Sequence, residues 1–250
     1  MSAVRPGAWR GLVAPGLAAL VAFAILLGLG TWQVERRAWK QDLIARILRQ
    51  SRAEPVAPPT PDAWDPARDE FRHVRLEGRF LDDRETLVHG LAPGETPGRA
   101  LQGYYVITPL VRDGGGTVLV NRGFVPTELK GQDRRRDGLV DGPATVTGIL
   151  RASEPRTMFV PEPDPARGEW FNRDVAGIGA ARGLTDFAPY MVEADAMPGQ
   201  TTWPRGGQLR VDLPNNHLQY AFTWFGIAAC LVGVFGVYAW RQVHEPAQTA

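Results

Sequence analysis

The chain has two long runs without charged residues, one near each end. Between them lies a more polar region in which short stretches alternate apolar and polar residues. Gly11 to Val34 contains no charged residue over 24 positions, and Leu218 to Trp240 contains none over 23. As a helix rising 1.5 Å per residue, each run is long enough to cross the roughly 30 Å hydrocarbon core of a bilayer. The sequence therefore predicts transmembrane helices over 11–34 and 213–240, the second entered through a short polar stretch.

The first run is interpreted as a retained membrane anchor. Arg5 and Arg10 precede it, as basic residues precede a secretory signal, but the apolar part of such a signal usually spans only about 7–15 residues. With two spans, the tails 1–10 and 241–250 lie on one side of the membrane and residues 35–216 on the other. The helices then form a hairpin, and the end of the first lies near the start of the second.

Small residues recur at four-residue spacing in both runs. They are Ala14, Ala18 and Ala22 in the first run, and Ala229 and Gly233 in the second. This spacing lets two helix backbones approach closely. Small residues are also common in membrane helices that make no such contact, so the spacing leaves open whether these residues form a helix–helix interface.

Residues 35–50 continue the helical pattern beyond the first span. Apolar residues recur there at helical spacing among charged ones: Trp39, Leu43, Ile44, Ile47 and Leu48. An amphipathic helical extension is predicted, packed on the domain in preference to lying on the lipid surface. Residues 51–70 hold five prolines and are interpreted as an extended linker.

The region 71–212 changes to short runs of strand-forming residues separated by turn residues. The predicted strands are Val74–Phe80, Glu85–Leu91, Gly103–Val111, Thr117–Val125, Ala144–Leu150, Tyr190–Glu193 and Gln208–Val211. Asp113 to Gly116 predicts a hairpin turn, and Phe171 to Arg182 a short helix closed by Gly183. The fold class is therefore a membrane protein with two transmembrane α-helices forming a hairpin around a β-rich (α+β) extramembrane domain.

Composition and motifs exclude several functions. A formal charge of +1 leaves no basic excess for phosphate contacts, so no nucleic-acid partner is expected. The single cysteine, Cys230, lies in an apolar run and cannot form an intrachain disulfide or a CxxC redox site. Phosphate-binding loops, HExxH and GxSxG motifs are missing from the sequence, and no enzymatic activity is predicted.

One of the four histidines stands apart. His73 and His89 lie in predicted strands without cysteine partners and are assigned structural roles, and His244 lies in a polar tail. His217 stands at the threshold of an apolar helix, where an imidazole needs a partner or a ligand. It is the candidate site residue.

The neighbours of His217 on a helix are Tyr220, Ala221 and Trp224, at i+3, i+4 and i+7. A flat macrocycle fits such an aromatic wall, and neutral imidazole is a strong axial ligand for haem iron. The hairpin brings Trp32 and Gln33 to the same face, to complete the pocket or to give a hydrogen bond to a propionate. The residues alone favour a hydrogen-bonded interfacial histidine over a haem ligand, with Trp32 an interfacial anchor.

Several separated stretches resemble the Surfeit locus protein 1 family of cytochrome c oxidase assembly factors. They are Gly28-Leu29-Gly30-Thr31-Trp32-Gln33 followed by Arg36; Gly103-Tyr104-Tyr105-Val106-Ile107-Thr108-Pro109-Leu110; Val120-Asn121-Arg122-Gly123-Phe124-Val125-Pro126; Trp170-Phe171-Asn172-Arg173-Asp174; and Pro214-Asn215-Asn216-His217-Leu218-Gln219-Tyr220-Ala221-Phe222-Thr223-Trp224. These matches extend over residues 28–240 in the family's order. Within them, Asn121-Arg122-Gly123 is interpreted as a structural turn with a solvated arginine in preference to a contact surface.

The resemblance implies an assembly factor for haem-copper oxidase in the bacterial inner (cytoplasmic) membrane, with the central domain in the periplasm. It implies that haem a binds transiently through His217, the only metal ligand expected, and passes to oxidase subunit I. The implied partners are subunit I, other oxidase assembly factors and the haem a synthesis enzyme, beside the lipid bilayer.

Charge around the first span conflicts with that orientation. Two basic residues, Arg5 and Arg10, precede the span, and more follow it: Arg36, Arg37, Lys40, Arg46 and Arg49. Because basic residues tend to stay on the cytoplasmic side of a membrane, this count places the domain in the cytoplasm. Because long segments translocate largely regardless of charge, the resemblance is preferred.

Two other functions compete with haem delivery. One is a protein-interaction scaffold that stabilises an oxidase assembly intermediate without binding haem. The other is a haem-modifying or redox membrane enzyme, which the lack of any acid, base or cofactor motif disfavours.

Overall fold

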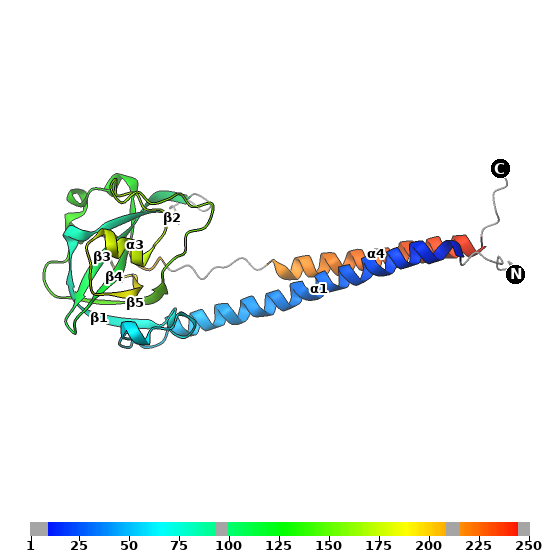
Figure 1. Cartoon of the computed structure of the whole chain (residues 1–250), viewed down its shortest axis with the longest axis horizontal. Coiled ribbons are helices and arrows are strands. Elements are labelled where there is room, and N and C mark those ends of the chain that lie inside the picture. The colour runs from blue at the N-terminus through cyan, green and yellow to red at the C-terminus, as the bar shows by residue number, and fades with distance from the viewer. Residues whose placement is uncertain (1–9, 94–99, 209–215, 245–250) are drawn as a thin grey trace. The chain divides into compact units, whose positions relative to one another are not determined.

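The computed structural model describes residues 10–93, 100–208 and 216–244, which belong to two compact units. One unit, Met1–Ala45 with Asp212–Ala250, holds the long helices, and the other, Arg46–Val211, holds all the strands. Two apolar helices and a β-rich domain are thus both present, which confirms the predicted fold class (Figure 1).

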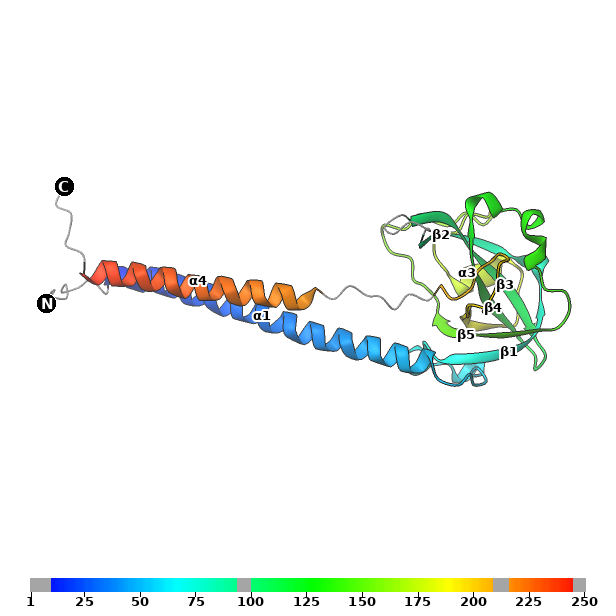
Figure 2. The ribbon, with the colours of Figure 1, turned by 180° about the vertical axis from the view of Figure 1, so that it is seen from behind.

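The helical unit is an antiparallel pair of α1 (Arg10–Ser51) and α4 (His217–His244), each long and apolar enough to cross a membrane. Figures 1 and 2 show the two helices side by side from opposite directions. With 42 residues, α1 runs about 63 Å, roughly twice the thickness of the hydrocarbon core. It therefore includes both the first apolar run and the amphipathic stretch after it, without a break.

The contact between the helices uses other small residues than those singled out by spacing. Gly30, Ala221 and Ala228 are buried. A Cβ on Gly30 would lie 2.5 Å from the ring of Phe225, so only a glycine lets that ring pack against α1. By contrast, Ala14, Ala18, Ala229 and Gly233 are exposed, and Ala22 is half-buried. The spacing left open whether these residues form the helix contact, and in the structure the exposed four do not.

The domain is a six-stranded sheet in the order β1-β5-β6-β4-β3-β2 that closes through an additional pairing of β1 with β3. The strands are β1 (His73–Phe80), β2 (Thr86–Pro93), β3 (Ala100–Arg112), β4 (Thr117–Pro126), β5 (Ala144–Ala152) and β6 (Phe187–Ala194). Among these six strands β4 and β6 pair in parallel, and the other strand pairs are antiparallel. The long β3 makes closure possible, because its end pairs with β1 around Val111 while its start pairs with β2.

Three apolar clusters fill the described part of the domain, and the two largest involve opposite faces of β4. Val118 and Val120 of β4 pack in the first with Tyr190 of β6, while Leu119 packs in the second against Trp170. Alternate residues thus point to opposite faces, as strand geometry requires, and both faces are apolar. The second cluster is covered by α3 (Val175–Ala181), whose Ile178 is fully buried.

Connections between the strands agree with the sequence in part. The turn at Asp113–Gly116 is confirmed, because Val111 pairs with Thr117 directly across it. The predicted helix over 171–182 is shorter, since α3 begins four residues later. The proposed late strand 208–211 lies outside the described residues apart from Gln208, which is in no strand. Short helical turns fill the remaining connections: α2 (Pro66–Asp69), η1 (Pro61–Ala63), η2 (Asp82–Arg84), η3 (Thr127–Leu129) and η4 (Gln132–Gly138).

The Asn121-Arg122-Gly123 motif lies inside β4, and the expected turn with a solvated arginine is wrong. Arg122 is only 8% exposed, and its Nη1 donates to Asp82 Oδ1 at 2.9 Å. Burial lowers the pKa of Arg122 and raises that of the Asp82 carboxyl. Gly123 has φ +125° and packs on the backbone of Arg205, where a Cβ would lie 2.0 Å from the carbonyl oxygen. The motif is a tight internal packing site.

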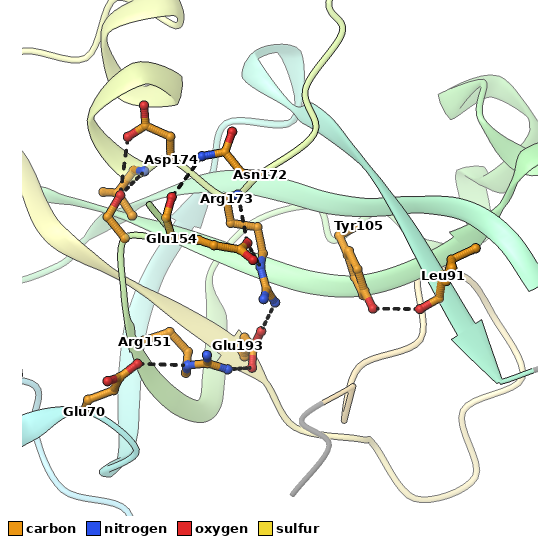
Figure 3. A network of polar contacts seen from close by, with 11 residues as sticks. Glu70, Leu91, Tyr105, Arg151, Glu154, Asn172, Arg173, Asp174 and Glu193 are labelled. Atoms are coloured by element: carbon orange, nitrogen blue, oxygen red, sulfur yellow. Dashed lines mark hydrogen bonds and ion pairs between the residues drawn. The ribbon is translucent and has the colours of Figure 1, made fainter. Parts of the chain in front are cut away.

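A network of ion pairs joins the Trp170–Asp174 motif to the sheet (Figure 3). Glu193, 4% exposed, accepts hydrogen bonds from Arg151 at 3.1 Å and from Arg173. Burial opposes the charge on Arg173, but Glu193 and Glu154 outweigh it and raise the pKa of this guanidinium. Because a buried carboxylate needs an oppositely charged, hydrogen-bonded partner, Arg151 and Arg173 have a structural role.

His73 and His89 both take structural positions. His73 bonds the Ala53 carbonyl at 2.8 Å and the Asp195 carboxylate at 2.7 Å. His89 stacks on Phe171 with ring centroids 4.9 Å apart. Neither ring lies in a group of three potential metal ligands, and no such group occurs within residues 10–93, 100–208 and 216–244.

We expect Gly30→Leu to separate the two helices and Gly28→Leu to leave them paired. A leucine at position 30 overpacks against Phe225, which typically costs about 1–3 kcal/mol, whereas a Cβ at Gly28 meets nothing within 4 Å. Spin labels on the native Cys230 and on Ala18→Cys report the separation as a distance distribution. That distribution should broaden only in Gly30→Leu, and equal distributions in both variants would contradict the packing described.

Candidate functional site

The polar contact between α1 and α4 joins Gln33 and His217. His217 Nδ1 lies 2.7 Å from Gln33 Oε1, and Gln33 is 9% exposed. His217 is the first residue of α4 and is half-buried. The contact lies where the apolar run of α1 ends, so it closes the helix pair at one end of the apolar region.

The partner decides which imidazole nitrogen carries the proton. A glutamine Oε1 can only accept, so the hydrogen in this contact is donated by Nδ1 of His217. When the ring is neutral, its lone pair is on Nε2, for which the described part of the chain gives no hydrogen bond. Imidazoles that bind metals are usually held in this way, with the second nitrogen donating to a fixed acceptor.

The other predicted site residues differ in how closely they approach this pair. Ala221, one turn after His217, is 2% exposed. Trp224 is half-buried, whereas Trp32 and Tyr220 are 53% and 55% exposed. The structure therefore brings Gln33 and His217 together, buries Ala221 one turn further along α4, and leaves the rings of Trp32 and Tyr220 largely exposed.

These side chains can offer one nitrogen lone pair next to apolar and aromatic surface. That donor set suits the axial position of a planar metal macrocycle, which needs one imidazole and an apolar wall. It does not suit a free metal ion, which needs three or four protein ligands. Catalysis would need an acid or base beside the imidazole, and the described contacts of His217 supply only an amide.

Comparison with known proteins identifies the family. The model of the SURF1 family matches residues 20–229, which is most of the chain. The chain belongs to the SURF1 family. This confirms the resemblance drawn from the motifs, and the match contains α1 from Leu20 onward, the whole sheet and the first part of α4.

Individual members of the SURF1 family agree over most of their length. Surfeit locus protein 1 of Rattus norvegicus is 40% identical over 216 residues, 82% of this chain and 69% of the relative. The Homo sapiens protein of the same name is 38% identical over 213 residues, 81% of this chain and 70% of the relative. A SURF1-like protein of Drosophila melanogaster is 36% identical over 219 residues, 82% and 71% of the two chains.

Sequence reasoning did not find the acceptor role of Gln33. It placed Gln33 near His217 through the hairpin, but assigned it to a pocket wall or a propionate. With Oε1 held by the imidazole, only the Nε2 amide of Gln33 remains to donate to a ligand. The available signal was the lone amide at the end of an apolar run, where a polar side chain needs a partner in the other helix.

We expect ¹⁵N-histidine NMR of the purified protein to show His217 as the Nδ1–H tautomer, with a proton-bearing Nδ1 and an unprotonated Nε2. Gln33→Leu removes the acceptor and should convert the signal to a mixture of tautomers. Gln41→Leu, two turns further along α1, should leave the signal unchanged. A wild-type ring protonated on Nε2 would contradict the assignment.

Proposed function

We propose that this protein is an assembly factor for haem-copper (cytochrome c) oxidase that binds haem a at the outer membrane face and assists its insertion into oxidase subunit I. The observation that carries the proposal is the Gln33–His217 hydrogen bond, which leaves the Nε2 lone pair for iron. Membership of the SURF1 family supports it, because the motifs that identified the family include both residues.

Each residue of the site has a distinct part in binding. His217 provides the iron ligand, and Gln33 fixes its tautomer and raises its basicity as the acceptor of the Nδ1 proton. Trp224 and Tyr220 lie beside the ring on α4, and Trp32 lies next to Gln33 on α1, where they offer aromatic surface to the porphyrin. When bound, the haem supplies only its iron and its planar surface, because the protein carries it as cargo.

The same site also favours release of the bound haem. One protein ligand and a wall with two largely exposed aromatic rings bind a macrocycle less firmly than an enclosed pocket does. A position at the end of the apolar region also lets a membrane-embedded acceptor approach from the side. Moderate affinity and lateral access are what a carrier needs if it is to transfer haem to subunit I.

We place the protein in the bacterial inner membrane with the domain in the periplasm. The basic residues after the first span oppose this orientation, but a domain of this length translocates largely regardless of flanking charge. The partners proposed are subunit I, further oxidase assembly factors and the enzyme that synthesises haem a. The chain itself is assigned no catalytic step.

A haem-free scaffold is the second candidate, favoured by exposed apolar side chains on the domain. Phe159 is 89% and Met158 86% exposed, and Phe159 lines a hollow of about 490 Å³ with Leu91 of β2. Large exposed apolar side chains of this kind commonly mark protein contacts. The scaffold function would need this surface and would not need His217.

We expect His217→Ala, purified from cells that make haem a, to lose at least about nine-tenths of the haem that copurifies with the wild type, because its only iron ligand is gone. His244→Ala is the matched control. It removes the histidine at the other end of α4, which is exposed, and should retain wild-type haem content. The absorption spectrum and extraction of the haem measure the haem content of the two variants.

The same variants separate the two candidate functions in cells. Oxidase activity in membranes should fall in His217→Ala and stay normal in His244→Ala. Full oxidase assembly by a haem-free His217→Ala protein would reject haem delivery and favour the scaffold.

A further inference from the structure

Charged residues are segregated around α1 in the two turns after Gln33. At 100° per residue, Arg36, Arg37 and Lys40 lie on the Gln33 side of the helix, at i+3, i+4 and i+7. The acidic residues Glu35 and Asp42, at i+2 and i+9, lie on the opposite side. The side of α1 that carries Gln33 is therefore cationic in these two turns, and the carboxylates lie on the opposite side of the helix.

This cationic face begins where α4 stops covering α1. His217 is the first residue of α4 and contacts Gln33, so α1 continues from Val34 onward without α4 beside it. Arg37 is half-buried, and Arg36 is exposed with its guanidinium 4.0 Å from the ring of Trp39. No ion pair with a carboxylate is recorded for either arginine among the residues the structure describes.

Arginines of the domain differ from Arg36 and Arg37 because they form ion pairs with carboxylates. In the domain, Arg122, Arg151 and Arg173 each contact at least one carboxylate at hydrogen-bond distance. Arginine is suited to carboxylates because its planar fork can donate two parallel hydrogen bonds. Arg37 lies one turn beyond Gln33 on the same side of α1, and no ion pair joins it to a carboxylate within the described residues, so its guanidinium is suited to an anionic group on a ligand held by His217.

We propose that Arg37, assisted by Arg36, binds the carboxylates of the macrocycle whose iron His217 ligates. This inference rests on the proposed function and names the part of the ligand that is recognised. A porphyrin with two propionates is anionic at one edge and apolar elsewhere. Along the helix pair, the aromatic residues Tyr220 and Trp224 follow His217 into the apolar run, and the basic turn of α1 lies on the other side of the imidazole, beyond Gln33. Apolar surface, iron ligand and cationic charge are thus available for the apolar part, the iron and the anionic edge of such a macrocycle. Arg37 thereby sets orientation and specificity, because an uncharged macrocycle gains nothing from it.

The test compares haem a with its dimethyl ester, in which both carboxylates are neutral. Haem-free wild type, Arg37→Gln and Arg49→Gln in a neutral detergent are titrated with each compound. Arg49→Gln is the matched control, since Arg49 is an exposed arginine three turns further along α1. We expect wild type and Arg49→Gln to bind haem a about tenfold more tightly than the ester, as hydrogen bonds to charged groups allow. In Arg37→Gln the two affinities should become equal.

Binding of the ester also reports folding, because it needs His217 but not the arginines. Arg37→Gln should therefore bind the ester as wild type does, and Arg36→Gln should lose part of the discrimination. An unchanged ratio in Arg37→Gln would overturn the inference while leaving the proposed function intact. Failure of the wild type to bind either compound would overturn the proposed function and this inference together. Loss of copurified anionic phospholipid from Arg37→Gln, with the ratio unchanged, would assign the arginine to lipid instead.

Discussion

A single hydrogen bond between two apolar helices, from His217 to Gln33, positions the imidazole on which the proposed haem binding depends. An unpaired polar group out of water costs about 1–3 kcal/mol, so Gln33 and His217 stabilise each other best when they meet. Their meeting requires the close packing of α1 and α4 that Gly30 permits beneath the ring of Phe225. In that bond Nδ1 of the imidazole donates to Gln33, so Nε2 is the nitrogen that a neutral ring can offer to a ligand. Backbone approach, helix register and ligand chemistry are thus linked through one contact.

The two units use charge in different ways. In the domain the arginines are bound to buried carboxylates: Arg122 to Asp82, and Arg173 with Arg151 to Glu193. These pairs are internal, and they join strands and connections that lie far apart in the sequence. The basic residues of α1 just beyond Gln33 lie on one face with the acidic ones opposite. The domain is therefore internally compensated, while the helical unit carries the side chains suited to an anionic, iron-containing ligand.

Elements governed by local pattern could be predicted from the sequence, and features set by packing between elements could not. The apolar runs predicted α1 and α4, and alternation located most of the strands, because membrane length and strand period are local properties. The buried position of Arg122 was missed, since a strand looks the same whether or not Asp82 lies across from it. Spacing of small residues left the helix contact undecided, because it carries no information on where the partner packs. The hairpin predicts that Gln33 lies near His217, 184 residues away, but the hydrogen bond between them depends on the register of the two helices, which no local pattern gives.

Electron–nuclear double resonance on the ferric, haem a-loaded protein with ¹⁵N-labelled histidine tests most directly whether His217 ligates the iron. We predict a ¹⁵N coupling to iron in the wild type that disappears in His217→Gly. Unlabelled imidazole added to His217→Gly should enter the vacated space and replace it with a ¹⁴N coupling. A ¹⁵N coupling that persists in His217→Gly would show that another histidine binds the iron and would contradict the account.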